Sequence, residues 1–161
     1  MLRESIIWLP LYLFLLVFIL MNFGIRGLLW SLGLICAASI CDIISSHVIK
    51  EQIMRIRPCR SPDIAHQVRF LVAYCPQSSS FISSHAANHF GVSMFIYVTL
   101  RQYISWTWLF FVWAAVISYA QVYVGVHFPG DVFCGGLAGC FLGYVPARLF
   151  NKYFSLVPSL K

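Results

Sequence analysis

Residues 6–23 read IIWLPLYLFLLVFILMNF, an apolar run without a charged side chain that is long enough to cross a membrane as a helix. A second run, residues 27–49, follows after a break of three residues at 24–26. Segments at about 84–100, 104–126 and 132–150 have similar lengths. Lipid tolerates only helices and closed barrels, and these lengths are helical. The sequence therefore predicts an all-α integral membrane bundle of about five transmembrane helices.

Composition supports this class. The chain has 161 residues, 60% hydrophobic and 10% charged, and its mean hydropathy is +0.81. Soluble domains are about half apolar and one quarter charged. One membrane-embedded domain over residues 1–161 is expected at this length. The net charge of +6 comes from basic residues in short loops beside apolar runs, so we expect membrane lipids and a phosphorylated lipid as partners, and no nucleic acid.

Three polar patches lie at the ends of these runs, and alternating spans place all three on one side of the membrane. The patches are Lys50-x6-Arg57-Pro58, Ser83-Ser84-His85 and His127-x3-Asp131. Charge does not fix which side this is, because the two faces carry nearly balanced sets of cations. The motif face has Arg3, Lys50, Arg55, Arg57, Arg60 and Arg69, and the other face has Arg26, Arg101, Arg148, Lys152 and Lys161.

The first two patches are typical of anion binding. Lys50 and Arg57 are seven residues apart, so they share a helical face if the second helix continues to Pro58, and two cations there would clamp phosphate oxygens. A basic helix end at lipid headgroups is the alternative. Ser83 or Ser84 would cap the third helix and leave backbone N–H groups for an anion, with His85 one step inside. A capped helix with an interfacial histidine is the alternative there.

The third patch is the most distinctive. Pro129 suits the first turn of the fifth helix, which would turn Asp131 back toward His127. A carboxylate bonded to one imidazole nitrogen fixes the tautomer and makes the other nitrogen a nucleophile or base. A carboxylate near a membrane span is costly unless it is paired.

Other polar or small residues have simpler interpretations. His85 and His89 have a zinc-pair spacing, but no Glu follows His85, so no metal site is predicted. Asp42 and His47 are expected to pair inside the bundle, and a supporting role under the site stays open. The four-residue spacing of three glycines in the fifth span predicts close helix packing; these are Gly135, Gly139 and Gly143. Cys59 and Cys75 lie in one long loop, and the sequence leaves open whether they pair in an oxidising compartment.

The patches, in this order on membrane helices, resemble the type 2 phosphatidic acid phosphatase/haloperoxidase superfamily over about residues 40–145. That family has the motifs Lys-x6-Arg-Pro, Pro-Ser-Gly-His and Ser-Arg-x5-His-x3-Asp. The resemblance implies a helical bundle, usually of six spans. It also implies a membrane lipid phosphatase that needs no metal or cofactor and forms a phosphohistidine. The expected location is a multi-pass protein of the inner (cytoplasmic) membrane, with its active site on the outer (periplasmic) face.

Roles carry over by position. The resemblance implies His127 as nucleophile, His85 as the acid that protonates the leaving group, and Asp131 as the carboxylate that orients His127. The phosphate would be bound by Lys50, Arg57, Ser83, Ser84 and Gln121.

The chain departs from the family pattern at three places. Ile82 and Ser84 replace the Pro and Gly of the second motif. Ala120 and Gln121 replace the Ser-Arg of the third, and glutamine donates hydrogen bonds but brings no charge. Arg55, Arg60 or Arg69 are candidates to supply the missing cation. One span fewer than usual is predicted, so either the family's first helix is dispensable or the true start lies upstream.

Two functions remain open. The first is hydrolysis of a lipid phosphomonoester or diphosphate, with undecaprenyl diphosphate as first choice and phosphatidic acid, phosphatidylglycerophosphate and lipid A phosphate as alternatives. The second is a catalytically impaired protein that binds or transports a lipid phosphate, because Gln121 replaces the motif arginine. A purely structural bundle would require all three patches to coincide by accident.

Overall fold

The computed structural model describes residues 5–156 and contains only helices and loops over that range. Arg3 and Lys161, which entered the charge balance, lie outside the described residues. The main helices are α1 (Leu9–Ile43), α3 (Ser84–Leu100), α4 (Leu109–Tyr123) and α5 (Pro129–Tyr153). Short elements join them, namely the 3-10 turns Ser5–Trp8, Pro58–Arg60 and Ser105–Trp108, the π-helical turn Ile44–Ile49 and α2 (Lys50–Gln52). The prediction of an all-α bundle is confirmed.

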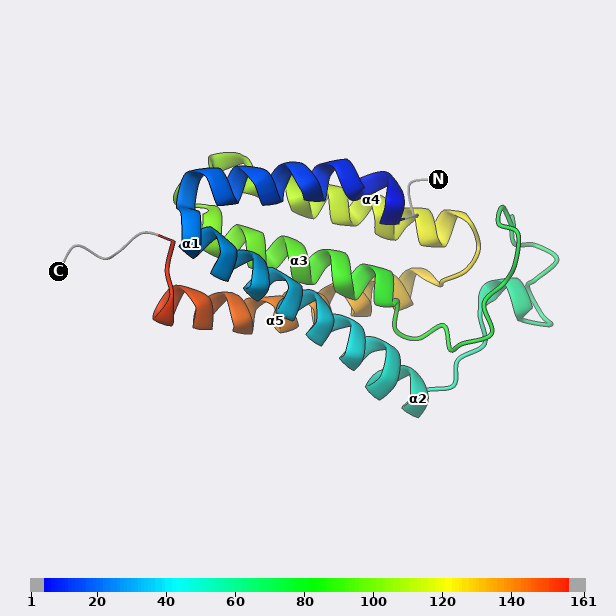
Figure 1. The fold of residues 1–161 in the computed structure, drawn as a ribbon. Helices are drawn as coiled ribbons and strands as arrows, with labels where there is room; N and C mark the ends of the chain where they lie inside the picture. The colour runs from blue at the N-terminus through cyan, green and yellow to red at the C-terminus, as the bar shows by residue number, and fades with distance from the viewer. Residues whose placement is uncertain (1–4, 157–161) are drawn as a thin grey trace.

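A sharp kink at Gly24 divides α1 into two arms, and the second arm turns back from the kink and diverges from the first (Figure 1). Gly24 has φ 54° and ψ −128°, a conformation that glycine adopts readily because it lacks a Cβ. The two arms correspond to the first two predicted spans. Near the same end of the bundle, Arg26 Nη1 donates to the Ser155 carbonyl at 3.1 Å and so ties α1 to the end of α5.

α3 is the central helix, and its most extensive contact is with α5. A Cβ on Gly139 or Gly143 would collide with the backbone carbonyl of Ala87 or Gly91, respectively. A Cβ on Gly135 would lie 2.6 Å from the Ser83 carbonyl oxygen. The glycine stripe is therefore the surface on which the backbones of α3 and α5 meet, and its predicted packing role is confirmed.

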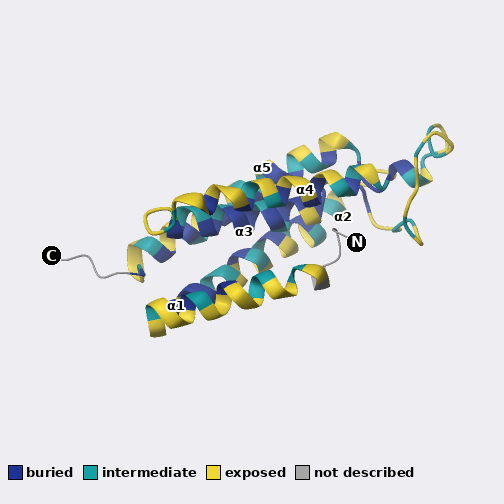
Figure 2. Cartoon of the chain, turned by 90° about the horizontal axis from the view of Figure 1, so that it is seen from above, coloured by how far each residue is buried: buried dark blue, intermediate teal, exposed yellow. Residues whose placement is uncertain are grey.

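The outer surfaces of the helices are apolar and exposed (Figure 2). Within residues 5–156, three helical segments are long and apolar enough to cross a membrane, namely Leu9–Gln52, Ser105–Tyr123 and Pro129–Tyr153. Leu9–Gln52 contains both arms of α1, whereas α3, with 17 residues, is largely buried among the other helices. These features are those of an integral membrane protein, and the count of five spans stays a prediction.

The loop between α2 and α3 gathers at the end of the bundle where α3 and α5 begin (Figure 1). Cys59 and Cys75 form a disulfide across this loop, with their Cα atoms 6.1 Å apart. Their pairing, left open by the sequence, is therefore present in the structure.

Gly143→Ala tests the helix contact. Because the new methyl group would meet backbone rather than a movable side chain, we expect the free energy of unfolding to fall by about 1–3 kcal/mol. The measurement is unfolding in a mild detergent titrated with a denaturing one. The matched control is Gly130→Ala, where a Cβ meets nothing within 4 Å. Equal stability of the two variants would contradict the packing account.

Candidate active site

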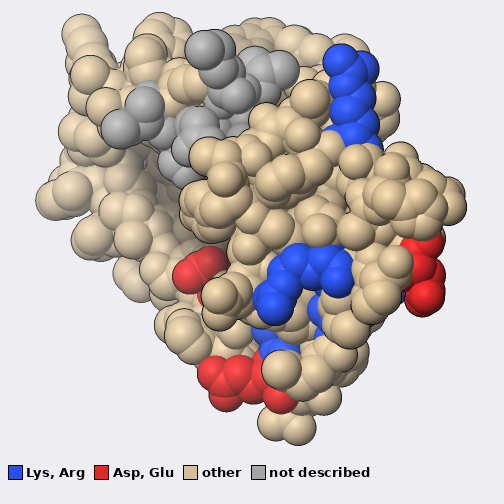
Figure 3. Space-filling model, turned by 90° about the vertical axis from the view of Figure 1, so that its right-hand side faces the viewer, with Lys and Arg blue, Asp and Glu red and all other residues tan. Residues whose placement is uncertain are grey.

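A polar cavity of about 400 Å³ opens at the end of the bundle that carries the three patches. Figure 3 looks onto this end, where basic side chains gather near the middle of the face. Six of the eight predicted site residues line the cavity, namely Lys50, Arg57, Ser84, His85, Gln121 and His127. Asp131 and Ser83 are fully buried and absent from this lining. The folded chain therefore brings together patches that are far apart in the sequence.

Arg57 is the most heavily bonded side chain of the site, with 5% of its surface exposed. Its Nε and Nη2 donate to the carbonyl oxygens of Ser78 and Ser79 at 2.9 and 3.2 Å. Its Nη1 donates to the Val126 carbonyl at 3.0 Å and lies 3.0 Å from His127 Nε2. Arg57 therefore joins the long loop to the segment that precedes α5.

The expected helical clamp of Lys50 and Arg57 is wrong in its geometry. The helix ends at Gln52, and Ile53 and Arg57 have extended backbones. A residue that precedes a proline disfavours helical backbone angles, which accounts for the extended backbone of Arg57 before Pro58. Farther back, the Arg55 carbonyl accepts from the Ser80 N–H at 2.8 Å, so contacts with the loop replace helical ones. Both cations reach the cavity, but from different backbone segments.

The contact with Arg57 fixes the tautomer of His127. A guanidinium can only donate, so His127 Nε2 accepts and the ring proton is on Nδ1. Nδ1 lies 3.5 Å from Ser80 Oγ and 3.7 Å from Asp131 Oδ2. Burial lowers the pKa of His127 below its ordinary value, and the charges of Arg57 and Lys50 lower it further, while Asp131 opposes them. His127 is thus held neutral, and the lone pair of Nε2 accepts the hydrogen bond from Arg57 Nη1.

Asp131 is surrounded by donors. Its Oδ2 accepts from the Ser80 hydroxyl and from the Phe128 N–H, the latter at 3.0 Å. Its Oδ1 accepts from Arg55 Nη1 at 2.7 Å. The expected direct bond to His127 is therefore long, and the Ser80 hydroxyl lies next to both groups. Sequence reasoning missed Ser80, because a serine in a serine-rich loop carries no motif signal.

The second patch divides into a structural serine and two cavity residues. Ser83 is the N-cap of α3: its side chain accepts from the Ala86 N–H at 3.4 Å, and its own N–H donates to the Asp131 carbonyl at 3.0 Å. Its N–H is therefore engaged within the protein. Ser84 and the exposed His85 line the cavity instead.

Gln121 stands where the family motif has arginine. It is 2% exposed and lines the cavity, and its Nε2 has no hydrogen-bond partner in the described part of the chain. Such an unsatisfied donor favours a ligand with acceptor oxygens. Arg55, Arg60 and Arg69 do not line the cavity; Arg55 lies over the Phe128 ring at 4.2 Å and is bonded to Asp131 Oδ1.

Two other expectations concern histidines. His85 and His89 have ring centroids 6.4 Å apart, and residues 5–156 contain no group of three or more His, Cys, Asp or Glu side chains placed to hold a metal ion. His47 is exposed and lies 3.6 Å from Glu51, so the expectation that it pairs inside the bundle is wrong.

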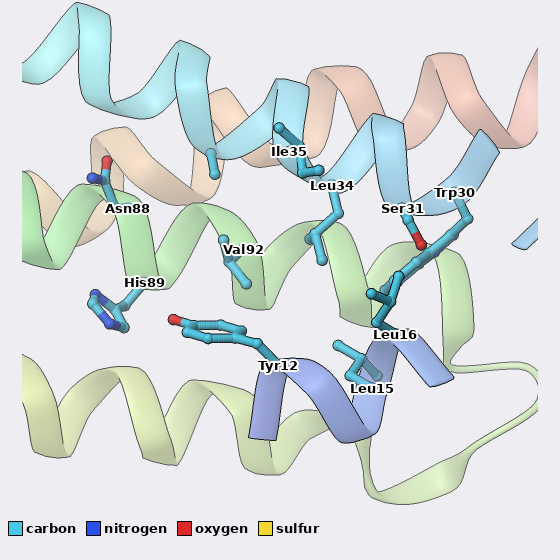
Figure 4. Close-up of a pocket in the computed structure, with 11 residues that line it drawn as sticks. Tyr12, Leu15, Leu16, Trp30, Ser31, Leu34, Ile35, Asn88, His89 and Val92 are labelled. Atoms are coloured by element: carbon cyan, nitrogen blue, oxygen red, sulfur yellow. The ribbon is translucent and has the colours of Figure 1, made fainter. Parts of the chain in front are cut away.

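An apolar groove of about 400 Å³ adjoins the polar cavity, and Asn88 and His89 line both (Figure 4). The groove lies between the two arms of α1 and α3. Its other lining is mostly apolar and includes Tyr12, Leu15, Leu16, Trp30, Leu34 and Val92. A ligand with a charged head and an apolar chain therefore fits this pair of spaces.

Comparisons with known proteins agree with this chemistry. A family model described as the PAP2 superfamily matches residues 27–155. The chain is 30% identical over 144 residues to a lipid A 4′-phosphatase of Bacteroides thetaiotaomicron, covering 88% of this chain and 63% of that protein. It is 30% identical over 111 residues to a lipid A 4′-phosphatase of Porphyromonas gingivalis, covering 69% of this chain and 47% of that one. This chain thus spans less than two thirds of either relative.

Two further similarities are more distant. An undecaprenyl-diphosphatase of Sulfolobus acidocaldarius is 32% identical over 81 residues, which are 50% of this chain and 38% of that protein. A crystal structure of a transmembrane PAP2-type phosphatidylglycerolphosphate phosphatase from Bacillus subtilis aligns with a TM-score of 0.66 at 24% identity. The alignment covers 99% of this chain and 75% of that one, and it supports the fold.

Arg57→Ala tests the bonding at the centre of the site. Removing the guanidinium leaves the carbonyls of Ser78, Ser79 and Val126 without this donor, so we expect the free energy of unfolding to fall by about 3 kcal/mol or more. The control is Arg60→Ala, an exposed arginine with one contact of 3.4 Å, for which we expect a change within about 0.5 kcal/mol. Detergent titration measures both, and a loss no larger than the control's would contradict the assignment.

Proposed function

The chain belongs to the PAP2 superfamily, and we propose that it is a membrane lipid phosphatase whose His127 is transiently phosphorylated. The observation that carries this proposal is the position of His127 Nε2. This nitrogen is unprotonated and lies 3.0 Å from Arg57 Nη1, and its side chain lines a polar cavity that adjoins an apolar groove. A lipid phosphate would place its headgroup in the cavity and its chain in the groove.

The reaction proceeds in two displacements. As the phosphate enters, Arg57 Nη1 transfers its hydrogen bond from His127 Nε2 to a phosphate oxygen, which frees the lone pair of Nε2. That lone pair attacks phosphorus, forming an N–P bond while the bond from phosphorus to the lipid oxygen breaks. His85, on the cavity wall, gives a proton to that leaving oxygen. Water then attacks phosphorus with His85 as the base, and the N–P bond breaks to release phosphate and restore His127.

The other residues orient and stabilise. The His127 Nδ1 proton faces Ser80 and Asp131, which stabilise the positive charge that the ring gains as the N–P bond forms. Lys50 and Arg57 oppose the charge of the phosphate oxygens, and the unsatisfied Gln121 Nε2 would donate to one of them. Ser84 lines the cavity and offers its hydroxyl for hydrogen bonding, and Ser83 caps the start of α3.

The substrate belongs to one of two classes. Two relatives are named lipid A 4′-phosphatase and a third undecaprenyl-diphosphatase, so the two classes are lipid A-type phosphates and polyprenyl diphosphates. Undecaprenyl diphosphate is the first choice from the sequence, and the cavity residue Asp42, discussed below, favours the other class. We place the protein in the inner membrane with the site toward the periplasm. The Cys59–Cys75 disulfide supports this side, because such bonds persist in oxidising compartments.

His127→Ala tests the nucleophile. We expect phosphate release from lipid phosphates by the purified protein to fall to background, because no other group takes over the N–P bond. The matched control is His66→Ala, an exposed loop histidine, which should keep wild-type activity. Phosphate release is measured in detergent micelles. Continued phosphate release by the His127→Ala protein would contradict the mechanism.

A second function is favoured by one observation. The charge of the motif arginine is absent at Gln121, and Arg57 is already bonded to three carbonyls of the protein. A site with fewer available cations would bind a lipid phosphate and hydrolyse it slowly or not at all. The chain would then act as a lipid-phosphate binding or transport protein.

Gln121→Arg separates the two functions. In a slow phosphatase the added guanidinium would stabilise the transition state, and we expect phosphate release to rise by about 10-fold or more. Gln121→Lys adds the charge without the forked donor and serves as the comparison. Binding of lipid phosphate with no hydrolysis in either variant would favour the binding protein.

A further inference from the structure

Asp42 is a carboxylate on the second arm of α1 that lines the same cavity as His127. We propose that Asp42, together with Asn88, recognises a hydroxyl group on the substrate headgroup. The reacting phosphate would then be attached to a sugar or another polyhydroxylated group. This inference rests on the proposed function and selects between its substrate classes.

The Asp42 carboxylate is held in place from one side. Asn88 Nδ2 donates to its Oδ1 at 3.0 Å, and the Ser46 hydroxyl approaches the same oxygen at 3.4 Å. Ser46 is in turn 2.9 Å from the hydroxyl of Ser84 on α3. The other oxygen, Oδ2, has no hydrogen-bond partner within residues 5–156, and the Asp42 side chain is exposed. A fixed carboxylate therefore offers one oxygen to a ligand.

The chemistry of that oxygen limits the ligand. An ionised carboxylate only accepts hydrogen bonds, and it repels the phosphate that the same cavity is proposed to hold. A carboxylate in a membrane helix is costly by itself. A hydroxyl donor on the substrate would offset both effects, whereas a polyprenyl phosphate has no donor on its chain.

Asn88 adds a second acceptor beside Asp42. Because its Nδ2 donates to the carboxylate, the orientation of its amide is fixed. Its Oδ1 is buried and has no hydrogen-bond partner in the described part of the chain. Two unsatisfied acceptors thus lie on neighbouring residues.

The location of this pair suits a headgroup. Asn88 lines both the polar cavity and the apolar groove, so the pair lies where a headgroup would join its chain. A sugar ring would place hydroxyl groups there, with its phosphate toward His127 and its acyl chain in the groove.

A competing explanation is that Asp42 only balances the charge of Lys50, which lines the same cavity. The two explanations differ in their consequences. Charge balance affects every phosphorylated lipid alike, because Lys50 acts on the phosphate. Hydroxyl recognition affects only lipids whose headgroup has a donor.

The experiment compares two phosphomonoester lipids, a glucosamine-based glycolipid phosphate and a polyprenyl monophosphate. The value of kcat/KM is measured for each with the full-length wild type, Asp42→Ala and Glu51→Ala. Glu51→Ala is the matched control, because it removes one negative charge as Asp42→Ala does. Glu51 is exposed, lies beside His47 and does not line the cavity. We expect the wild type to favour the glycolipid, and Asp42→Ala to lower the glycolipid-to-polyprenyl ratio 10-fold or more. Glu51→Ala should keep the wild-type ratio.

The outcomes separate the two levels of inference. If Asp42→Ala changes kcat/KM equally for both lipids, the role of Asp42 is to balance the charge of Lys50. That result overturns hydroxyl recognition, while the phosphatase proposal stands. If the wild type hydrolyses neither lipid, the phosphatase proposal fails, and the ratio of dissociation constants from native mass spectrometry replaces kcat/KM. An unchanged binding ratio then overturns the inference. If Asp42→Ala does not fold, Asp42→Asn replaces it in the comparison, because its side chain has nearly the same shape as that of Asp42.

Discussion

The backbone contact between α3 and α5 positions everything else in the site. Glycines on α5 let the two helices approach until Ser83, at the start of α3, donates its N–H to the Asp131 carbonyl at 3.0 Å. Any side chain on Gly135 would press on the Ser83 carbonyl and separate the two helix ends. A packing feature deep in the bundle thus controls where His85 lies relative to His127. In lipid, where hydrophobicity does not drive helix association, such close contact is a main source of stability.

Arg57 has both a structural and an electronic role at the centre of the site. Buried and bonded to three carbonyls, it anchors the loop, and its Nη1 also contacts His127 Nε2, which makes that nitrogen an acceptor. One side chain therefore links loop structure to the protonation state of the proposed nucleophile. The disulfide between Cys59 and Cys75 constrains the same loop, which brings Ser78, Ser79 and Ser80 to the site.

Much of the helical framework was predictable, because membrane helices have long apolar runs and Pro129 and Ser83 mark helix starts. The glycine stripe was also readable from its spacing. The course of the chain after Gln52 was not, because the extended backbone there depends on bonds to Ser79 and Ser80, more than 20 residues later. For the same reason Ser80 was missed, and the fixed amide of Asn88 could not be inferred from local sequence.

Phosphorylation of His127 is tested most directly by trapping the phosphohistidine intermediate. The purified protein would be mixed with a lipid phosphate carrying ³²P, quenched in alkali to preserve a phosphohistidine, and digested for peptide mapping. The account predicts label on the peptide that contains His127 and none in His127→Ala. Turnover without label, or label on a different residue, would contradict it.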